Sequence, residues 1–339
     1  MRFGVSLVAS GQREGATQAS MIRERVEMVR VARDAGYHIV SAGQHYAPLD
    51  GMLPQPMPLL ARLAGEAPGM VFQTGVLLGP FYNPVTFAEE AATLAAITGD
   101  NFRAAIGLGY RDAEFAMFGQ RPTDRLKRVI ELIGTSRRLL RGETVSTEGG
   151  FYPLNAVALA PGTVGEIPVP IMIGTGAVKG AARAGRIADG LYVTGYLPPS
   201  DVEQLVTTYL DNAQRAGTTE PIVSIRREVT VADSRKAALA RSGPGWIRTL
   251  SSYLSLGFEQ PSLARIVRSL EETGDAVDLP FIVGSPQECA EQIDLYQKLG
   301  VRDIVIRFDL NEATHAATLH AIEQFAADVM PLVPADTGR

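Results

Sequence analysis

The chain has 339 residues, of which 46% are hydrophobic and 20% charged, with a net charge of −5 and one cysteine. This length suits one α/β barrel with insertions, and the single cysteine excludes an intrachain disulfide framework and a metal site of several thiolates. We see no basic patch that would indicate nucleic-acid binding. The sequence has no run of about 18 apolar residues that would span a membrane and no recognisable signal peptide, so we expect a cytoplasmic enzyme.

Hydrophobic patterning predicts eight short strands, each followed by a helix. The strands are expected near residues 3, 38, 71, 102, 171, 190, 222 and 304. The longer helices are expected at 20–35, 58–66, 85–98, 122–141, 199–216, 234–250, 286–299 and 312–329, and a helix of small residues ends at 185. A small hairpin is expected at 143–152, whereas 257–278 is expected to be less regular.

Eight repeated strand–helix units indicate a parallel sheet that closes into a (β/α)₈ TIM barrel, with insertions at its C-terminal mouth. We therefore expect one domain over residues 1–339. An open doubly wound sheet is the alternative fold. It usually carries Gly-x-Gly-x-x-Gly after its first strand, and residues 6–15 lack this motif.

The strand near residue 102 ends in a glycine turn, which is the feature most typical of a ligand site. It runs into Gly107-Leu108-Gly109-Tyr110, and Glu114 and two phenylalanines follow at helical spacing. In a barrel the functional groups lie at the carboxyl ends of the strands. The alternative interpretation is an ordinary turn.

A second glycine turn opens a helix directly, in the run Gly174-Thr175-Gly176-Ala177-Val178. Free backbone N–H groups and the helix dipole make such a turn a candidate phosphate site. A plain strand-to-helix turn is equally compatible with this pattern.

His45 follows a glycine at a strand end and is the best candidate acid or base among four histidines. Structural or surface roles are expected for His38, His315 and His320, and Cys289 is expected to be a buried residue of a helix. No His-x-His, His-Glu-x-x-His or Gly-x-Ser-x-Gly motif occurs. So few converging acids and bases suggest that a cofactor carries the chemistry and that no metal is bound.

The chain resembles the bacterial-luciferase-like flavin oxidoreductase superfamily. The matching segments, in the family's order, are 36–46, 74–84, 106–119, 170–190, 283–286 and 299–301. The resemblance implies a (β/α)₈ barrel, usually dimeric, that binds FMN or its deazaflavin relative at the C-terminal mouth.

The resemblance also implies roles for individual residues. His45 would lie near the reactive edge of the flavin. The flavin ring would rest on Thr74-Gly75-Val76, with a cis peptide between Gly75 and Val76, and would be flanked by Leu108, Gly109 and Tyr110. Gly174, Thr175, Gly176, Ala177 and Val178 would hold the phosphate.

Two departures from the family pattern concern the cofactor. Many FMN-using members carry an arginine at the position of Leu108, and Arg111 is a candidate replacement. Gln44-His45-Tyr46 stands where members often have Glu-His-His.

The resemblance favours a two-component monooxygenase, which uses oxygen and reduced FMN from a separate reductase on a small organic substrate. His45 would be the acid or base, and Arg307 would pair with an anionic group of the substrate; an ordinary ion pair of Arg307 with Asp303 or Asp309 is the alternative. Residues 242–278 would form a mobile lid, irregular at 242–261, where the alternative is a surface loop with a buried Trp246. A deazaflavin-dependent hydride-transfer enzyme and a non-catalytic flavin-binding protein are the alternative functions.

Overall fold

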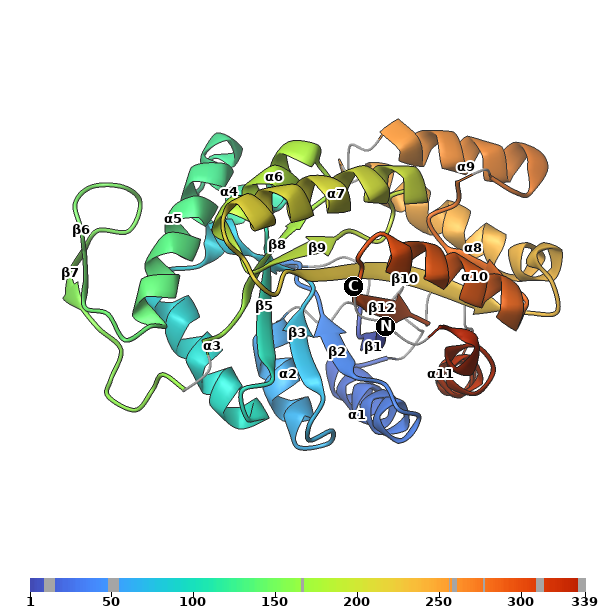
Figure 1. The fold of residues 1–339 in the computed structure, drawn as a ribbon, viewed down its shortest axis with the longest axis horizontal. Coiled ribbons are helices and arrows are strands. Elements are labelled where there is room, and N and C mark those ends of the chain that lie inside the picture. The colour runs from blue at the N-terminus through green and yellow to red at the C-terminus, as the bar shows by residue number, and fades with distance from the viewer. Residues whose placement is uncertain are drawn as a thin grey trace.

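Eight parallel strands close into a barrel that is surrounded by helices, a TIM barrel (Figure 1). The computed structural model describes residues 1–8, 16–47, 55–165, 168–255, 257, 261–276, 278–308 and 314–334. The barrel strands, in chain order, are β1 (Arg2–Ser6), β2 (Ile39–Ala42), β3 (Val71–Thr74), β5 (Phe102–Gly107), β8 (Ile171–Thr175), β9 (Gly190–Val193), β10 (Ile222–Val231) and β12 (Asp303–Arg307).

The barrel closes between its first and last strands, where β1 pairs with β12 and Val5 lies opposite Ile306. The strands therefore lie around the barrel in the order in which they occur in the chain, and all eight are at the predicted positions. The stretch 70–79, expected as one strand, is divided into β3 and β4 (Leu77–Leu78), which pairs with β5. One short strand was not predicted: β11 (Ile282–Gly284), which pairs with the last residues of β10. Runs of two or three apolar residues are too short to show a period.

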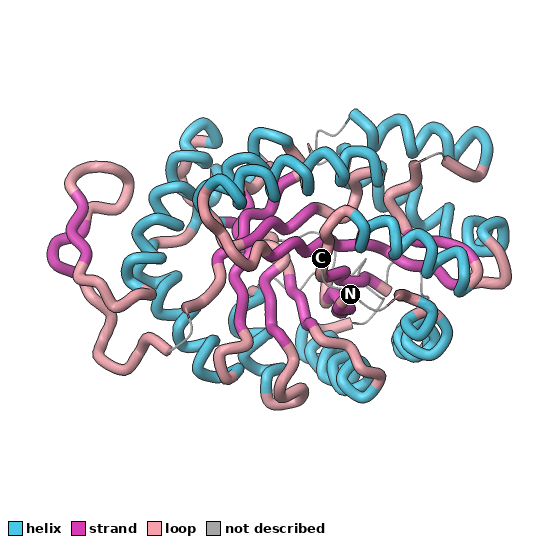
Figure 2. The backbone as a smooth tube through the Cα atoms, viewed as in Figure 1, coloured by secondary structure: helices cyan, strands magenta, loops and turns pink. Residues whose placement is uncertain are grey.

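Helices cover the outside of the barrel, as Figure 2 shows by colour. They are α1 (Gln18–Asp34), α2 (Pro56–Ala64), α3 (Pro84–Thr98), α4 (Asp112–Met117), α5 (Arg125–Leu139), α6 (Val178–Ile187), α7 (Pro199–Arg215), α8 (Arg235–Ser255), α9 (Pro261–Thr273), α10 (Pro286–Lys298) and α11 (His315–Asp328), with 3₁₀ turns η1 (Gly79–Phe81), η2 (Pro122–Asp124) and η3 (Met330–Leu332). Their ends follow local sequence rules. Ser285, for example, forms a capping box with Glu288 at the start of α10. None of the described helices is both long and apolar enough to cross a membrane.

The barrel interior contains charged residues at both of its ends. At the amino-terminal end, Asp303 is buried and forms ion pairs of 2.8 Å with Arg2 and Arg103. Toward the carboxyl ends of the strands, the buried residues Arg226 and Glu228 are two positions apart in β10. Since successive residues of a strand face opposite sides, this spacing points both side chains to one face of β10.

The predicted hairpin is present, as β6 (Val145–Thr147) paired antiparallel with β7 (Leu154–Val157). It projects from one end of the molecule in Figure 1, whereas α8 and α9 lie at the other end.

The expectation that 242–261 is irregular was wrong up to Ser255, because α8 continues through Gly243-Pro244-Gly245. Leu239, Trp246 and Leu250 lie on one buried face of this helix, and Trp246 stacks on Phe281 with ring centroids 4.3 Å apart. Burial of this face outweighs the cost of a helix-internal proline. Residues 256, 258–260 and 277 of the predicted lid lie outside the described part of the chain.

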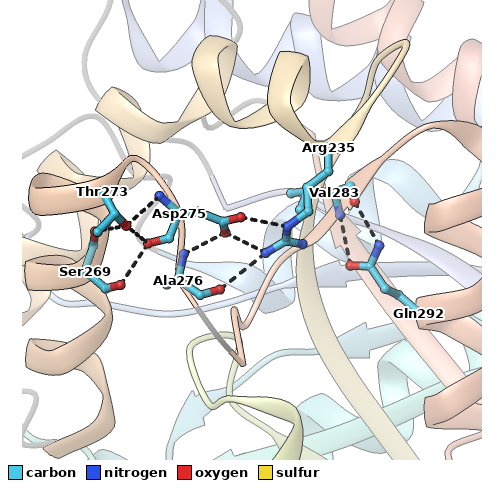
Figure 3. A network of polar contacts seen from close by, with 7 residues as sticks. All are labelled: Arg235, Ser269, Thr273, Asp275, Ala276, Val283 and Gln292. Atoms are coloured by element: carbon cyan, nitrogen blue, oxygen red, sulfur yellow. Dashed lines mark hydrogen bonds and ion pairs between the residues drawn. The ribbon is translucent and has the colours of Figure 1, made fainter.

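The expectation that 257–278 is less regular was also wrong for most of this stretch, because α9 occupies 261–273. Its buried residues are Ser262, Leu263, Ile266, Val267 and Leu270, which is the spacing of an amphipathic helix. The chain after α9 is tied to the first residue of α8: Asp275 accepts two hydrogen bonds from the Arg235 guanidinium, at 3.1 and 2.7 Å (Figure 3).

Candidate active site

A cavity of about 260 Å³ opens at the carboxyl ends of the barrel strands. Eight of the eleven predicted cofactor residues line it: Gly75, Val76, Leu108, Gly109, Tyr110, Gly174, Thr175 and Gly176. His45 lines it as well. The fold therefore brings together strand ends that lie far apart in the chain, from His45 to Gly176.

Part of the cavity wall is backbone, built around the peptide bond between Gly75 and Val76, which is cis as expected. The Val76 side chain lies between two glycines of neighbouring strands. A Cβ atom on Gly107 would lie 2.7 Å from Val76 Cγ2, and one on Gly174 would lie 2.5 Å from Val76 Cγ1. Both positions therefore require glycine so that Val76 can lie against the ends of β5 and β8.

His45 is held by a buried carboxylate. Its Nδ1 lies 3.0 Å from Glu114 Oε1, and the same oxygen accepts the backbone N–H of Tyr46 at 2.9 Å. A carboxylate only accepts hydrogen bonds, so the imidazole donates from Nδ1 and its Nε2 lies on the other side, 3.5 Å from the Tyr110 hydroxyl. The ring is thus oriented with one nitrogen available to the cavity, as an acid or base requires.

No role was predicted for Glu114 from the sequence, in contrast to His45. Glu114 is fully buried in α4, and its Oε2 has no hydrogen-bond partner within the described residues. The sequence contained one signal, an acidic residue on the apolar side of a short helix next to two phenylalanines.

Gln44 anchors the segment that carries His45. Its backbone N–H donates to Val76 O at 3.1 Å, and its side-chain oxygen accepts the Leu78 N–H at 2.9 Å. Its side-chain nitrogen contacts the Tyr46 and Tyr82 hydroxyls at 3.2 and 3.0 Å. The ends of β2 and β3 are therefore fixed to each other next to the cavity.

Three predicted cofactor residues do not line the cavity. Thr74 is buried, and its hydroxyl exchanges hydrogen bonds with the backbone of Ala105 at 2.8 and 2.9 Å, which ties β3 to β5. Ala177 is the N-cap of α6, and Val178 is the first residue of that helix, with 38% of its surface exposed.

The first turn of α6 has no side-chain cap. Thr175 Oγ1 accepts the Ala177 N–H at 3.1 Å, just before the helix begins. Arg183, one turn into α6, lines a small adjoining cavity with Leu108, Gly174 and Thr175. Within the described residues Arg183 forms no hydrogen bond or ion pair, so a cation is available beside this turn.

Arg111 is not that cation, contrary to the suggestion that it replaces an arginine at position 108. Its Nη1 lies 3.4 Å from Glu114 Oε1 and 3.5 Å from the carbonyl oxygen of Tyr46. It therefore belongs to the polar group around His45.

Arg307 was expected to face the substrate, but it is only 3% exposed and does not line the cavity. Its Nη1 donates to the Tyr196 hydroxyl at 3.2 Å and lies 3.8 Å from Glu228 Oε1. The alternative partner Asp303 is engaged by Arg2 and Arg103, and Asp309 lies outside the described residues. The arginine that lines the cavity is Arg226, together with Tyr192, Tyr196 and Tyr253.

Sequence reasoning missed Arg226 and these tyrosines. The signal for Arg226 was the pair Arg226-Arg227 within a buried strand, because a buried charge has to be compensated. Arg227 faces the other way: it is fully buried and donates to the Tyr296 hydroxyl at 2.9 Å. Tyr253 comes from α8, in a stretch that was interpreted as a loop.

The remaining histidines and the cysteine lie away from the cavity. His38 and His320 are exposed, and His315 Nε2 lies 2.8 Å from Glu27 on α1. Cys289 is buried in α10, as expected, and burial raises the pKa of its thiol to about 12.

A family model described as luciferase-like monooxygenase matches residues 1–303. The F420-dependent glucose-6-phosphate dehydrogenase of Kribbella flavida is 25% identical over 327 residues, which cover 92% of this chain and 94% of the relative. The 4-hydroxyprotoasukamycin monooxygenase of Streptomyces nodosus subsp. asukaensis is 27% identical over 311 residues, 87% of this chain and 82% of the relative. The crystal structure of monooxygenase RslO1 from Streptomyces bottropensis has the same fold, with a TM-score of 0.84 at 22% identity over 98% of this chain and 99% of that one.

Proposed function

Because the chain belongs to the luciferase-like monooxygenase family, we propose that it is the oxygenase of a two-component system, using oxygen and reduced FMN on a small organic substrate. When bound, the flavin supplies the activation of oxygen, which no side chain can supply alone. The observation that carries the proposal is the cavity, where glycine backbone and apolar side chains meet a histidine held by a buried carboxylate.

The residues present fit a flavin. Gly75, Gly107 and Gly174 line the cavity, so a planar ring could lie against their backbone. Leu108, Gly109 and Tyr110 would flank the ring. The phosphate would bind at the uncapped start of α6, which offers backbone N–H groups. Arg183 would supply the cation that is missing at Leu108.

The scarcity of cations favours FMN over the deazaflavin F420. Among the described residues that line the cavity, Arg226 is the one cation, and Arg183 lies in the adjoining cavity. The longer anionic tail of a deazaflavin would call for further lysines or arginines near the barrel mouth. A deazaflavin-dependent hydride-transfer enzyme is the second candidate, since an F420-dependent dehydrogenase is among the relatives and Leu108 is not an arginine.

His45 would hold or release a proton through Nε2, while Glu114 fixes the ring from the Nδ1 side. The apolar lining would exclude water from the reacting groups; Val8, Val76, Leu78 and Leu108 contribute to it. The third alternative, a flavin-binding protein without turnover, makes no use of a histidine whose Nε2 is available to the cavity.

A separate flavin reductase is the partner that this proposal requires. One relative, at 21% identity over 98% of this chain, is named as the oxygenase component of a flavin-dependent trigonelline monooxygenase. The homodimer that the family resemblance implies is part of the same proposal.

Anaerobic titrations of the purified protein with reduced FMN and with reduced F420, followed by absorbance, test the choice of cofactor. We expect saturable binding of reduced FMN and weaker or no binding of F420. Tight binding of F420 with none of FMN would select the hydride-transfer alternative.

A further inference from the structure

We propose that the cavity wall formed by Arg226, Tyr196 and Tyr253 binds an anionic oxygen of the ligand, and that the ligand is otherwise apolar. We take this ligand to be the substrate of the enzyme, and that identification rests on the proposed function. The binding itself does not require a flavin.

Arg226 is a buried residue of the cavity wall, and it is incompletely paired. It is 8% exposed and lines the cavity, and its Nε has no hydrogen-bond partner within the described residues. Its guanidinium carbon lies 4.9 Å from the centre of the Tyr196 ring. A Cβ atom on Gly195 would lie 2.7 Å from this Nε, so the glycine leaves room for the guanidinium.

Glu228 compensates the charge of Arg226 only in part. The Arg226–Glu228 distance is 3.9 Å, longer than a hydrogen bond, and the same carboxylate oxygen lies 3.8 Å from Arg307. One carboxylate is therefore shared between two guanidinium groups, and neither of its oxygens has a hydrogen-bond partner within the described residues. A buried charge is stabilised only by close pairing and hydrogen bonds, so an anionic oxygen next to Arg226 would complete this group.

The positive charge of Arg226 and Arg307 also affects the tyrosines beside them. Burial raises the pKa of the Tyr253 phenol, but Arg226, Arg307 and a hydrogen bond with Tyr196 together lower it by more, and the net pKa lies below its ordinary value. Burial raises the pKa of Tyr196 well above its ordinary value, and Tyr253 and Glu228 raise it further. The Tyr196 hydroxyl thus stays protonated.

The other residues that line the cavity indicate the polarity of the rest of the ligand. Apart from the residues proposed to hold the flavin, Val8 and Leu78 present apolar surface, which favours an aliphatic or aromatic body. The candidate phosphate site lies after β8, whereas Arg226 is on β10, with β9 between them. The anionic group bound by Arg226 is therefore a second group, separate from the flavin phosphate.

The test compares matched anionic and neutral probes: benzoate, naphthoate and octanoate, each against its primary amide, measured by isothermal titration calorimetry on the full chain without flavin. We expect at least one carboxylate to bind about tenfold or more tightly than its amide, the usual scale for a charge-assisted hydrogen bond. Arg226→Met should remove this preference and leave amide binding unchanged. Arg226→Lys should retain part of it, and therefore carries the test if the methionine variant does not fold. Arg215→Met, on the exposed end of α7, is the matched control.

The inference is overturned if amides bind as tightly as carboxylates, if no probe binds, or if the preference survives in Arg226→Met. Titration of the same samples with FMN separates this outcome from a failure of the proposed function. A preference for carboxylates without FMN binding would contradict the proposed function and support the anion site. FMN binding without this preference would support the proposed function and contradict the anion site.

Discussion

His45 Nδ1 lies 3.0 Å from Glu114 Oε1, although 69 residues separate them in the chain. The contact joins the end of β2 to α4, the short helix that follows β5. The same oxygen accepts the Tyr46 N–H, so one carboxylate fixes both the imidazole ring and the backbone that follows it. A histidine fixed in this way presents the same nitrogen to the cavity in every molecule.

The first prediction concerns this pair. His45→Ala and Glu114→Gln should fold normally and bind FMN within a few-fold of the parent, yet lose about 10²-fold or more in turnover, the usual scale for a general acid or base. His38→Ala, at an exposed position, is the matched control. Melting temperature and turnover are measured on the same preparations. A loss of stability in proportion to the loss of activity would assign His45 a packing role.

The second prediction concerns the phosphate site. Gly176→Asp places a carboxylate in the turn before α6, where it would repel the phosphate of FMN, so the affinity for FMN should fall at least about tenfold. Gly134→Asp, on the exposed side of α5 with open space at its Cβ, controls for an added charge. Affinities are measured by flavin fluorescence quenching. Unchanged binding in Gly176→Asp would mean that the phosphate binds elsewhere.

The third prediction concerns pH and the Arg235–Asp275 contact shown in Figure 3. Burial raises the pKa of Asp275, but hydrogen bonds from Arg235 and from the Ala276 N–H lower it by more, to below its ordinary 3.8. The ionised form is therefore favoured in the folded state. Its stabilisation is present above the unfolded pKa and is lost as the pH falls through the folded pKa.

Asp275→Asn should accordingly lower the free energy of unfolding at neutral pH by about 1 kcal/mol or less, because both partners are partly exposed. The difference from the parent should shrink below pH 3.8, the ordinary pKa of this carboxyl. Asp211→Asn, on the exposed side of α7, is the control. The free energies of unfolding of the parent and of both variants are measured by denaturant unfolding at several pH values. A difference that grows on acidification would contradict the assignment.

The fourth prediction concerns Cys289. Because its thiol is fully buried and burial raises its pKa to about 12, almost no thiolate exists near neutral pH. Ellman's reagent should therefore react with the native protein only as fast as it unfolds, and at once in denaturant. Rapid labelling of the folded protein would show that α10 opens locally.

The eight barrel strands could be predicted because most are buried, mainly apolar runs bounded by glycine or polar turns, and this signal is local. The turns at Gly107–Gly109 and Gly174–Gly176 were informative for the same reason. The partnership of His45 with Glu114 was not accessible, since it depends on how α4 packs against the end of β2. Arg226 and Arg307 show the same limit: Arg226 lies within β10 and Arg307 ends β12, and only packing decides which of them reaches the cavity.

The most direct test of the proposed function is the reaction of the protein–FMN complex with oxygen. The anaerobic complex with reduced FMN is mixed with oxygenated buffer in a stopped-flow instrument, and the return of oxidised FMN is followed by its absorbance. A monooxygenase that shields its flavin predicts a slower return with the protein than in free solution. The contradicting result is a return at the same rate in both, together with turnover of a substrate by reduced F420 and the protein.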